Sequence, residues 1–73
     1  MRETGISKIS KSTGLSVGHT SDLLSGQKEF GKYAANCFAK LLNISRFKVM
    51  EMGDTAQGRK RLKNKCLSKI GGN

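Results

Sequence analysis

The fold of this chain is decided by one stretch, Ile9-Ser-Lys-Ser-Thr-Gly-Leu-Ser-Val-Gly-His-Thr-Ser-Asp-Leu-Leu-Ser-Gly26. Gly14 is suited to end a helix, because glycine adopts the left-handed backbone conformation at little steric cost. Ser16, two residues later, is a preferred N-cap for a following helix. We therefore expect two short helices joined by a tight turn, over residues 6–13 and 17–25.

The spacing of small and apolar residues indicates how these two helices pack. Ser10 is small enough to lie where the helices cross closely, and Leu15, Thr20 and Leu23 occupy positions that face inward. This layout is that of a helix-turn-helix unit.

Three further helices are expected, over residues 32–42, 46–52 and a last segment that begins at Asp54 or Thr55 and ends before Gly71. Asn43 ends the third helix, Ser45 caps the fourth, and Gln57 follows Asp54 by three residues, as in a capping box. No alternating pattern predicts strands, so the expected fold class is all-α, a small bundle of about five helices. The residues expected in the core of the later helices are Phe30, Tyr33, Ala34, Cys37, Phe38, Leu41, Leu42, Phe47, Val49, Met50, Leu62, Cys66 and Ile70.

Positive charge is concentrated at the C-terminal end. The 73 residues carry 14 Lys and Arg against 5 Asp and Glu, a formal net charge of +9. Six of the basic residues and none of the acids lie in residues 55–73. We therefore divide the chain into a helix-turn-helix domain, residues 1–54, and a basic C-terminal segment, residues 55–73, which we expect to be helical and not a separate domain. The charge favours a polyanionic partner, nucleic acid first.

The composition argues against several other functions. The chain has two cysteines, Cys37 and Cys66, and one histidine, His19, which are too few and too irregularly spaced for a zinc site. No nucleophile–base or paired-carboxylate arrangement is recognisable, so we expect no metal, no cofactor and no enzymatic activity. No stretch approaches the ~20 apolar residues that span a membrane, and no signal-peptide core follows the N-terminus. A cytoplasmic location is therefore expected.

The stretch from Ile9 to Gly26 resembles the helix-turn-helix of the lambda-repressor and Cro-type regulators. The likeness continues through Tyr33-Ala-Ala-Asn-Cys-Phe-Ala-Lys-Leu-Leu-Asn-Ile-Ser45, which is similar to that family's fourth helix and the turn after it. The similar region covers about residues 5–52. The resemblance implies a sequence-specific transcriptional repressor of phage or prophage type, which binds double-stranded DNA as a dimer or higher oligomer on a palindromic operator.

One departure from the family concerns the N-terminus. Members of the family usually begin with a further helix, whereas only residues 1–4 precede the first expected helix here. The face that this helix would cover, near Ile6 and Phe38, needs another cover. Either the C-terminal segment or a partner protomer supplies it.

The resemblance implies base contacts from the second helix of the unit. Its first, second and sixth positions are Val17, Gly18 and Asp22, with Ser21 beside them, and Lys28 matches a further base-contacting position. Val17 can touch a thymine methyl group, and Asp22 can accept from a cytosine amino group. Because residues 16–25 contain no Lys, Arg, Asn or Gln, we expect modest direct readout with help from DNA shape.

Phosphate contacts are expected from hydroxyl groups, basic side chains and helix N-termini around this reading helix and in the C-terminal segment. Any one of the candidate residues could instead be a solvated surface residue with no role in DNA binding. The candidates are Lys8, Lys11, Ser16, His19, Ser25, Lys32, Arg59, Lys60 and Arg61. The C-terminal segment has three compatible roles, as a phosphate clamp, as a helix that completes the core, or as a means of self-association.

Two main classes of function remain open at this point. The leading one is the repressor, controlled by its own level or by an antirepressor protein. The alternative is a small interaction module, of antitoxin or antirepressor-partner type, whose main ligand is a protein. A third possibility is a nonspecific nucleic-acid-coating peptide driven by the basic segment.

Overall fold

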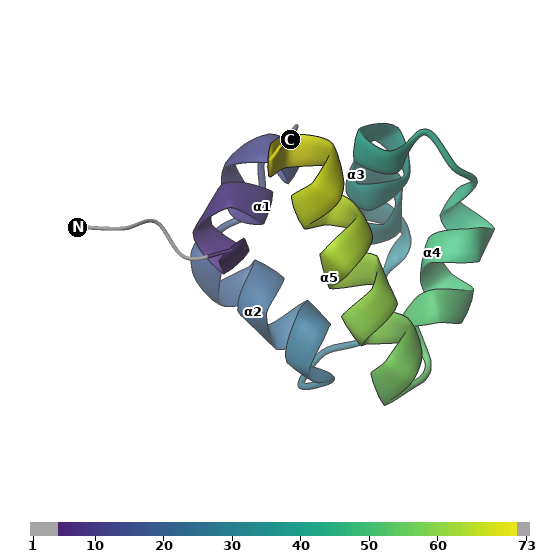
Figure 1. Cartoon of the computed structure of the whole chain (residues 1–73). Coiled ribbons are helices and arrows are strands. Elements are labelled where there is room, and N and C mark those ends of the chain that lie inside the picture. The colour runs from purple at the N-terminus through teal and green to yellow at the C-terminus, as the bar shows by residue number, and fades with distance from the viewer. Residues whose placement is uncertain (1–4, 72–73) are drawn as a thin grey trace.

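A computed structural model describes residues 5–71 and contains five helices packed into one bundle (Figure 1). They are α1 (Gly5–Thr13), α2 (Val17–Ser25), α3 (Lys32–Leu42), α4 (Arg46–Gly53) and α5 (Ala56–Gly71). No strand occurs in the described residues, so the predicted all-α bundle of about five helices is confirmed.

The turn between α1 and α2 forms as its residues predict. Gly14 adopts a left-handed φ of 81°, and the side chain of Ser16 accepts a hydrogen bond from the backbone N–H of His19 at 3.1 Å. Ser10 is buried, and its hydroxyl donates to the carbonyl of Leu15. The small residue at the helix crossing therefore also fastens the turn to α1.

Helix α5 starts at one of the two predicted residues, Thr55, and not at the other, Asp54. The cap is Thr55, whose hydroxyl accepts from the N–H of Gly58 at 2.9 Å. Asp54 has helical dihedrals, and its N–H bonds to the carbonyl of Glu51. Since an N-cap residue needs extended dihedrals, the predicted capping box of Asp54 and Gln57 is wrong, and the alternative start at Thr55 is the one observed.

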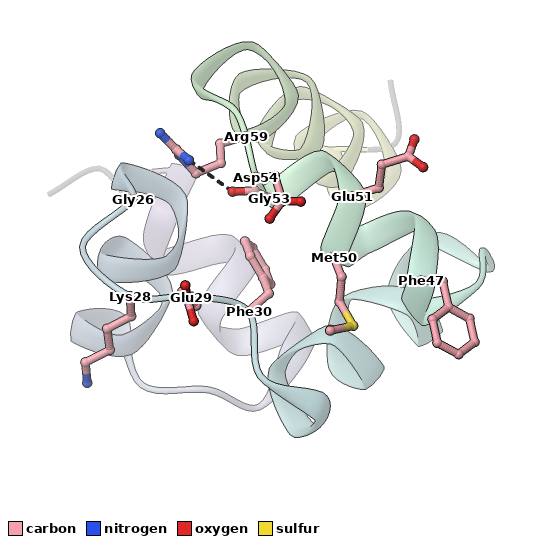
Figure 2. Close-up of a pocket in the computed structure, with 10 residues that line it drawn as sticks. All are labelled: Gly26, Lys28, Glu29, Phe30, Phe47, Met50, Glu51, Gly53, Asp54 and Arg59. Atoms are coloured by element: carbon pink, nitrogen blue, oxygen red, sulfur yellow. Dashed lines mark hydrogen bonds between the residues drawn. The ribbon is translucent and has the colours of Figure 1, made fainter.

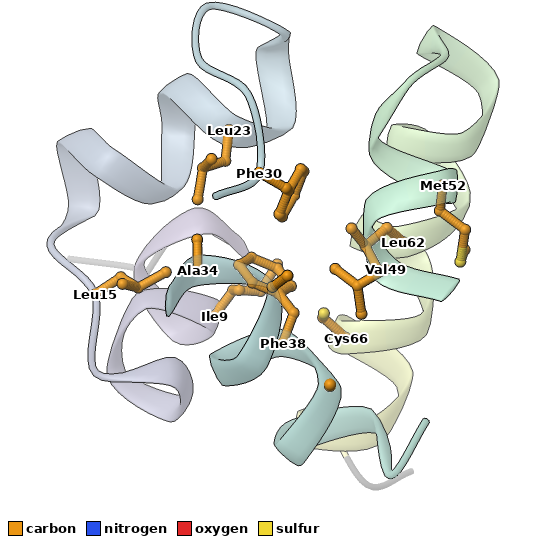
Figure 3. Close-up of a cluster of buried hydrophobic side chains, with 12 residues drawn as sticks. Ile9, Leu15, Leu23, Phe30, Ala34, Phe38, Val49, Met52, Leu62 and Cys66 are labelled. Carbon is orange, nitrogen blue, oxygen red and sulfur yellow. The ribbon is translucent and has the colours of Figure 1, made fainter. Parts of the chain in front are cut away.

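The core lies where α1, α2, α3 and α4 meet α5 (Figure 3). Its largest fully buried side chains are those of Phe38, Ile9, Leu23, Leu62 and Val49. The rings of Phe30 and Phe38 meet edge to face, with centroids 5.2 Å apart. The remaining buried hydrophobic residues are Leu15, Ala34, Ala35, Ala39, Met52 and Cys66.

Helix α5 crosses the bundle and contacts each of the other four helices (Figure 1). Leu62 and Cys66 are fully buried in the core, and Leu67 packs closely against Gly5 at the start of α1. Of the two predicted ways to cover the face near Phe38, the C-terminal segment is therefore the one that the structure has.

Three residues predicted to face the core are exposed instead. Tyr33 is 68% exposed, because α3 buries Ala34, Ala35, Phe38 and Ala39 and Tyr33 lies on the opposite side of the helix. Phe47 is 68% and Met50 is 38% exposed. Helix α4 instead buries Val49 and Met52, since these two residues, three positions apart, share the face that meets α3 and α5.

The buried thiol of Cys66 gives a pH-dependent contribution to stability. Burial raises its pKa from 9.0 to about 12. Between these two values the unfolded chain releases the thiol proton and the folded chain keeps it, so stability should fall as the pH rises through this window. We expect Cys66→Ala to flatten this alkaline loss in chemical denaturation measured at several pH values. Cys37→Ala, which removes the other thiol, is measured alongside as the control.

Candidate nucleic-acid interface

The exposed face of α2 is made of small side chains, of which only Asp22 is charged. Thr20 and Leu23 are buried, and with 3.6 residues per turn this turns one continuous arc of the helix outward. Val17 is 51% exposed, and Gly18 has no atom within 4 Å of the position a Cβ would take. The outward arc consists of Val17, Gly18, Ser21, Asp22 and Ser25. It holds four of the five predicted base-contacting residues.

The N-terminus of α2 combines a capped start with free donors. The Ser16 side chain accepts from the N–H of His19, and the Ser16 carbonyl accepts from the N–H of Thr20 at 2.9 Å. The first amides of a helix have no partner within it, and here they belong to Val17 and Gly18. Ser16 and these amides therefore present hydrogen-bond donors to an anion, whereas the half-buried His19 contributes its backbone to the cap.

Two of the predicted base-contacting residues, Asp22 and Lys28, contact each other at the C-terminal end of α2. Gly26 has a left-handed φ of 88°, and the carbonyl of Asp22 accepts from the N–H groups of Gln27 and Lys28. The Nζ of Lys28 lies 3.9 Å from a carboxylate oxygen of Asp22, and both side chains are about half exposed. Lys28, the only cation among the predicted base-contacting residues, is thus held beside Asp22, whose carboxylate would repel phosphate. Ser25 is exposed, and its hydroxyl donates to the same Asp22 carbonyl at 3.3 Å.

Three predicted phosphate-contacting lysines lie on α1 and at the start of α3. Lys8 and Lys11 are exposed on α1, three residues apart and hence on one side of the helix. Lys32 is exposed at the first position of α3, whose N-cap, Gly31, has an extended backbone and no side-chain cap. Gly31 therefore offers no side-chain acceptor to the amides at the start of α3.

Arg59 has a structural contact that its sequence position does not suggest. Its Nη1 donates to the carbonyl of Gly53 at 3.0 Å, and its guanidinium lies so close to Gly26 that a Cβ there would be 2.9 Å away. Arg59 therefore joins the end of α2, the end of α4 and the start of α5. The other two predicted clamp residues, Lys60 and Arg61, are exposed on α5.

Two basic residues further along α5 lie away from α2. Arg61 and Lys65 line a hollow together with Lys48 and Glu51 of α4, on the side of α5 where α4 packs. Of the predicted phosphate-contacting residues, Arg61 therefore lies beside α4, whereas Arg59 lies beside the end of α2.

A cleft of about 540 Å³ separates the loop after α2 from α4 and the start of α5 (Figure 2). Its lining includes three acids, Glu29, Glu51 and Asp54, and the exposed apolar side chains of Phe47 and Met50. The sequence prediction missed this surface because it assigned both apolar residues to the core. The available signal was four apolar residues, at positions 47, 49, 50 and 52, which an eight-residue helix cannot bury on one face.

Within residues 5–71, no three His, Cys, Asp or Glu side chains come together in a way that could hold a metal ion. In the same part of the chain, every helix is too short or too polar to cross a lipid bilayer. Comparison with protein families, with curated proteins and with solved structures finds no match to this chain.

Proposed function

We propose that this protein is a sequence-specific double-stranded-DNA-binding transcriptional repressor of phage or prophage type, which acts in the cytoplasm of a bacterial host. The observation that carries the proposal is the outward arc of α2, where Val17, Gly18 and Ser21 are exposed directly after a capped three-residue turn. A helix with small outward side chains can enter the major groove closely, and its flanking donors can fix its position on the phosphates.

In this proposal Val17 contacts a thymine methyl group and Ser21 a base edge, while Gly18 allows close approach of the backbone. Ser16, Ser25, Lys8, Lys11 and the start of α3 contact the phosphates on either side. The protein binds as a homodimer or higher oligomer, because two-fold repeats of the reading helix match a palindromic operator.

An interaction module for a protein ligand is the second candidate. Two observations favour it, namely the pairing of Lys28 with Asp22 and the lack of an exposed cation on the outward arc of α2. In a repressor the same surface would suit an antirepressor that competes with DNA.

Footprinting on the DNA that flanks the protein's own gene separates these functions. Protection of a short palindrome supports the repressor, and uniform coating of the DNA supports binding driven by the basic residues alone. No protection at low salt supports the interaction module.

The start of α3 offers a sharper mutational test. We expect Lys32→Ala to weaken DNA binding roughly tenfold for all sequences, since it removes a charge-assisted phosphate contact, and to reduce the slope of log affinity against log salt by about one. Lys40→Ala, which removes another exposed lysine in the last turn of the same helix, is the matched control. Equal losses from the two variants would show that Lys32 acts only through net charge.

A further inference from the structure

Arg59 places its guanidinium at the C-terminal ends of two helices (Figure 2). One is α4, whose last residue, Gly53, has a carbonyl that accepts from the Arg59 Nη1 at 3.0 Å. The other is α2, because a Cβ built on its C-cap residue, Gly26, would lie 2.9 Å from the guanidinium carbon. Arg59 is half-buried there, whereas Lys60 and Arg61 beside it are exposed.

The positive charge of Arg59 suits this position. The last carbonyls of a helix have no partner within it and carry partial negative charge, which a cation stabilises. Neither α2 nor α4 has a basic residue in its own last turn. Lys28 follows the end of α2, but its Nζ lies beside the carboxylate of Asp22. Arg59 therefore supplies, from a third helix, the cation that both last turns lack.

Gly26 allows the guanidinium to approach α2 this closely. Gly26 and Gly14 both end a helix with a left-handed φ, of 88° and 81° respectively. A Cβ on Gly14 would meet nothing within 4 Å, whereas a Cβ on Gly26 would meet the guanidinium. Backbone geometry thus favours glycine at both positions, and the approach of a neighbouring helix requires it only at Gly26.

We propose that Arg59 is a positioning residue, which fixes the C-terminal end of the reading helix α2 against the bundle and makes no phosphate contact itself. The inference rests on the proposed function, in which α2 enters the major groove. The N-terminal end of α2 is already fastened by the hydroxyl of Ser10, which donates to the carbonyl of Leu15, and by the Ser16 cap. With Arg59 at the other end, the tilt of α2 is set from both sides.

The tilt of α2 affects specificity because base contacts tolerate little displacement. The helix has nine residues and is about 13.5 Å long, and a contact has to be held within about 0.5 Å and 10–20°. Val17 and Ser21 have short side chains, which cannot extend to restore a contact that has moved. Loosening one end of α2 should therefore reduce the discrimination between DNA sequences.

A phosphate contact from Arg59 predicts a different result. Phosphate contacts carry no sequence information, so their loss weakens binding to all sequences alike and lowers the salt slope by about one. Lysine keeps the charge that a phosphate contact needs, but it lacks the flat guanidinium that lies against Gly26. Arg59→Lys therefore separates the two roles.

The first measurement is amide hydrogen exchange of the full chain by NMR, without DNA. The amides of Gln27 and Lys28 bond to the Asp22 carbonyl at the C-terminal end of α2. They should exchange at least about tenfold faster in Arg59→Lys, because this end then opens more easily. The amide of Gly14, which bonds to the carbonyl of Ser10 at the other end, should keep its rate.

Arg61→Lys is the matched control, since it makes the same replacement at an exposed position two residues further along α5. It should leave all these exchange rates unchanged. A circular dichroism melt checks that every variant is folded at the temperature used. Wild-type exchange at Gln27 and Lys28 in Arg59→Lys overturns the proposal.

The second measurement compares the affinities for two duplexes, one that the wild type selects from a random library and a shuffled one of the same composition. Arg59→Lys should raise the Kd of the selected duplex about tenfold, the loss of roughly one base contact, and change that of the shuffled duplex less than about twofold. Arg59→Gln, which also removes the charge, should lose the same specificity and keep the wild-type salt slope.

The outcomes separate this inference from the proposed function. Equal losses on both duplexes with a salt slope lower by about one in Arg59→Gln make Arg59 a phosphate contact and overturn the positioning role. Faster exchange with an unchanged ratio of the two Kd values shows that Arg59 only stabilises the fold, which also overturns it. A wild type that prefers no sequence counts against the proposed function, and the exchange rates alone then decide whether Arg59 holds α2.

Discussion

A chain shortened to residues 1–55 should lose its cooperative unfolding transition. Removing α5 takes away Leu62 and Cys66 and exposes the surfaces of Ile9, Phe38 and Val49 that share their cluster. Each fully buried side chain of this size contributes about 1.5–3 kcal/mol, and the whole stability of a domain is only about 5–15 kcal/mol. Thermal melting followed by circular dichroism measures the effect.

Point variants in α5 separate loss of the core from loss of the helix as a whole. Leu62→Ala should cost about 2–5 kcal/mol, since it leaves a cavity at a fully buried position. Asn64→Ala, at an exposed position two residues away, should change stability by less than about 0.5 kcal/mol. If the shortened chain melts at the wild-type temperature, α5 is not the cover of this core.

The second large effect is expected for Gly58→Ala. A Cβ at this position would lie 2.0 Å from the backbone carbonyl oxygen of Met52, so the start of α5 would have to move away from the end of α4. Overpacking of this kind costs about 1–3 kcal/mol, and we expect the upper end because the clashing atom belongs to the backbone. Chemical denaturation gives the change in unfolding free energy.

Gly18→Ala is the matched control for this variant. Gly18 also lies in the first turn of a helix, but a Cβ there would meet nothing within 4 Å. The replacement should leave stability unchanged or raise it by up to about 1 kcal/mol, because alanine favours the helix more than glycine does. Equal stabilities of the two variants would mean that α4 and α5 are not held as closely as the structure has them.

The sequence by itself determined where α1 and α3 end and where α2 and α4 begin. Gly14, Ser16, Asn43 and Ser45 act through hydrogen bonds to residues at most four positions away or through their own left-handed dihedrals. Such signals do not depend on the rest of the fold, so they could be predicted. The outward placement of Val17, Gly18 and Ser21 could also be predicted from local signals. Once Thr20 and Leu23 face the core, the opposite side of α2 is the one that points outward.

Only the tertiary structure decided which face of α4 is buried. Positions 47, 49, 50 and 52 are all apolar, and periodicity within the helix cannot choose between the two possible faces. The choice depends on α5, which approaches through Gly58 and buries the side of Val49 and Met52. The same is true of Arg59, whose carbonyl partner at Gly53 is set by how α4 turns into α5. Caps are local hydrogen bonds, whereas the burial of a face requires a second element to lie against it, and the position of that element is a property of the whole chain.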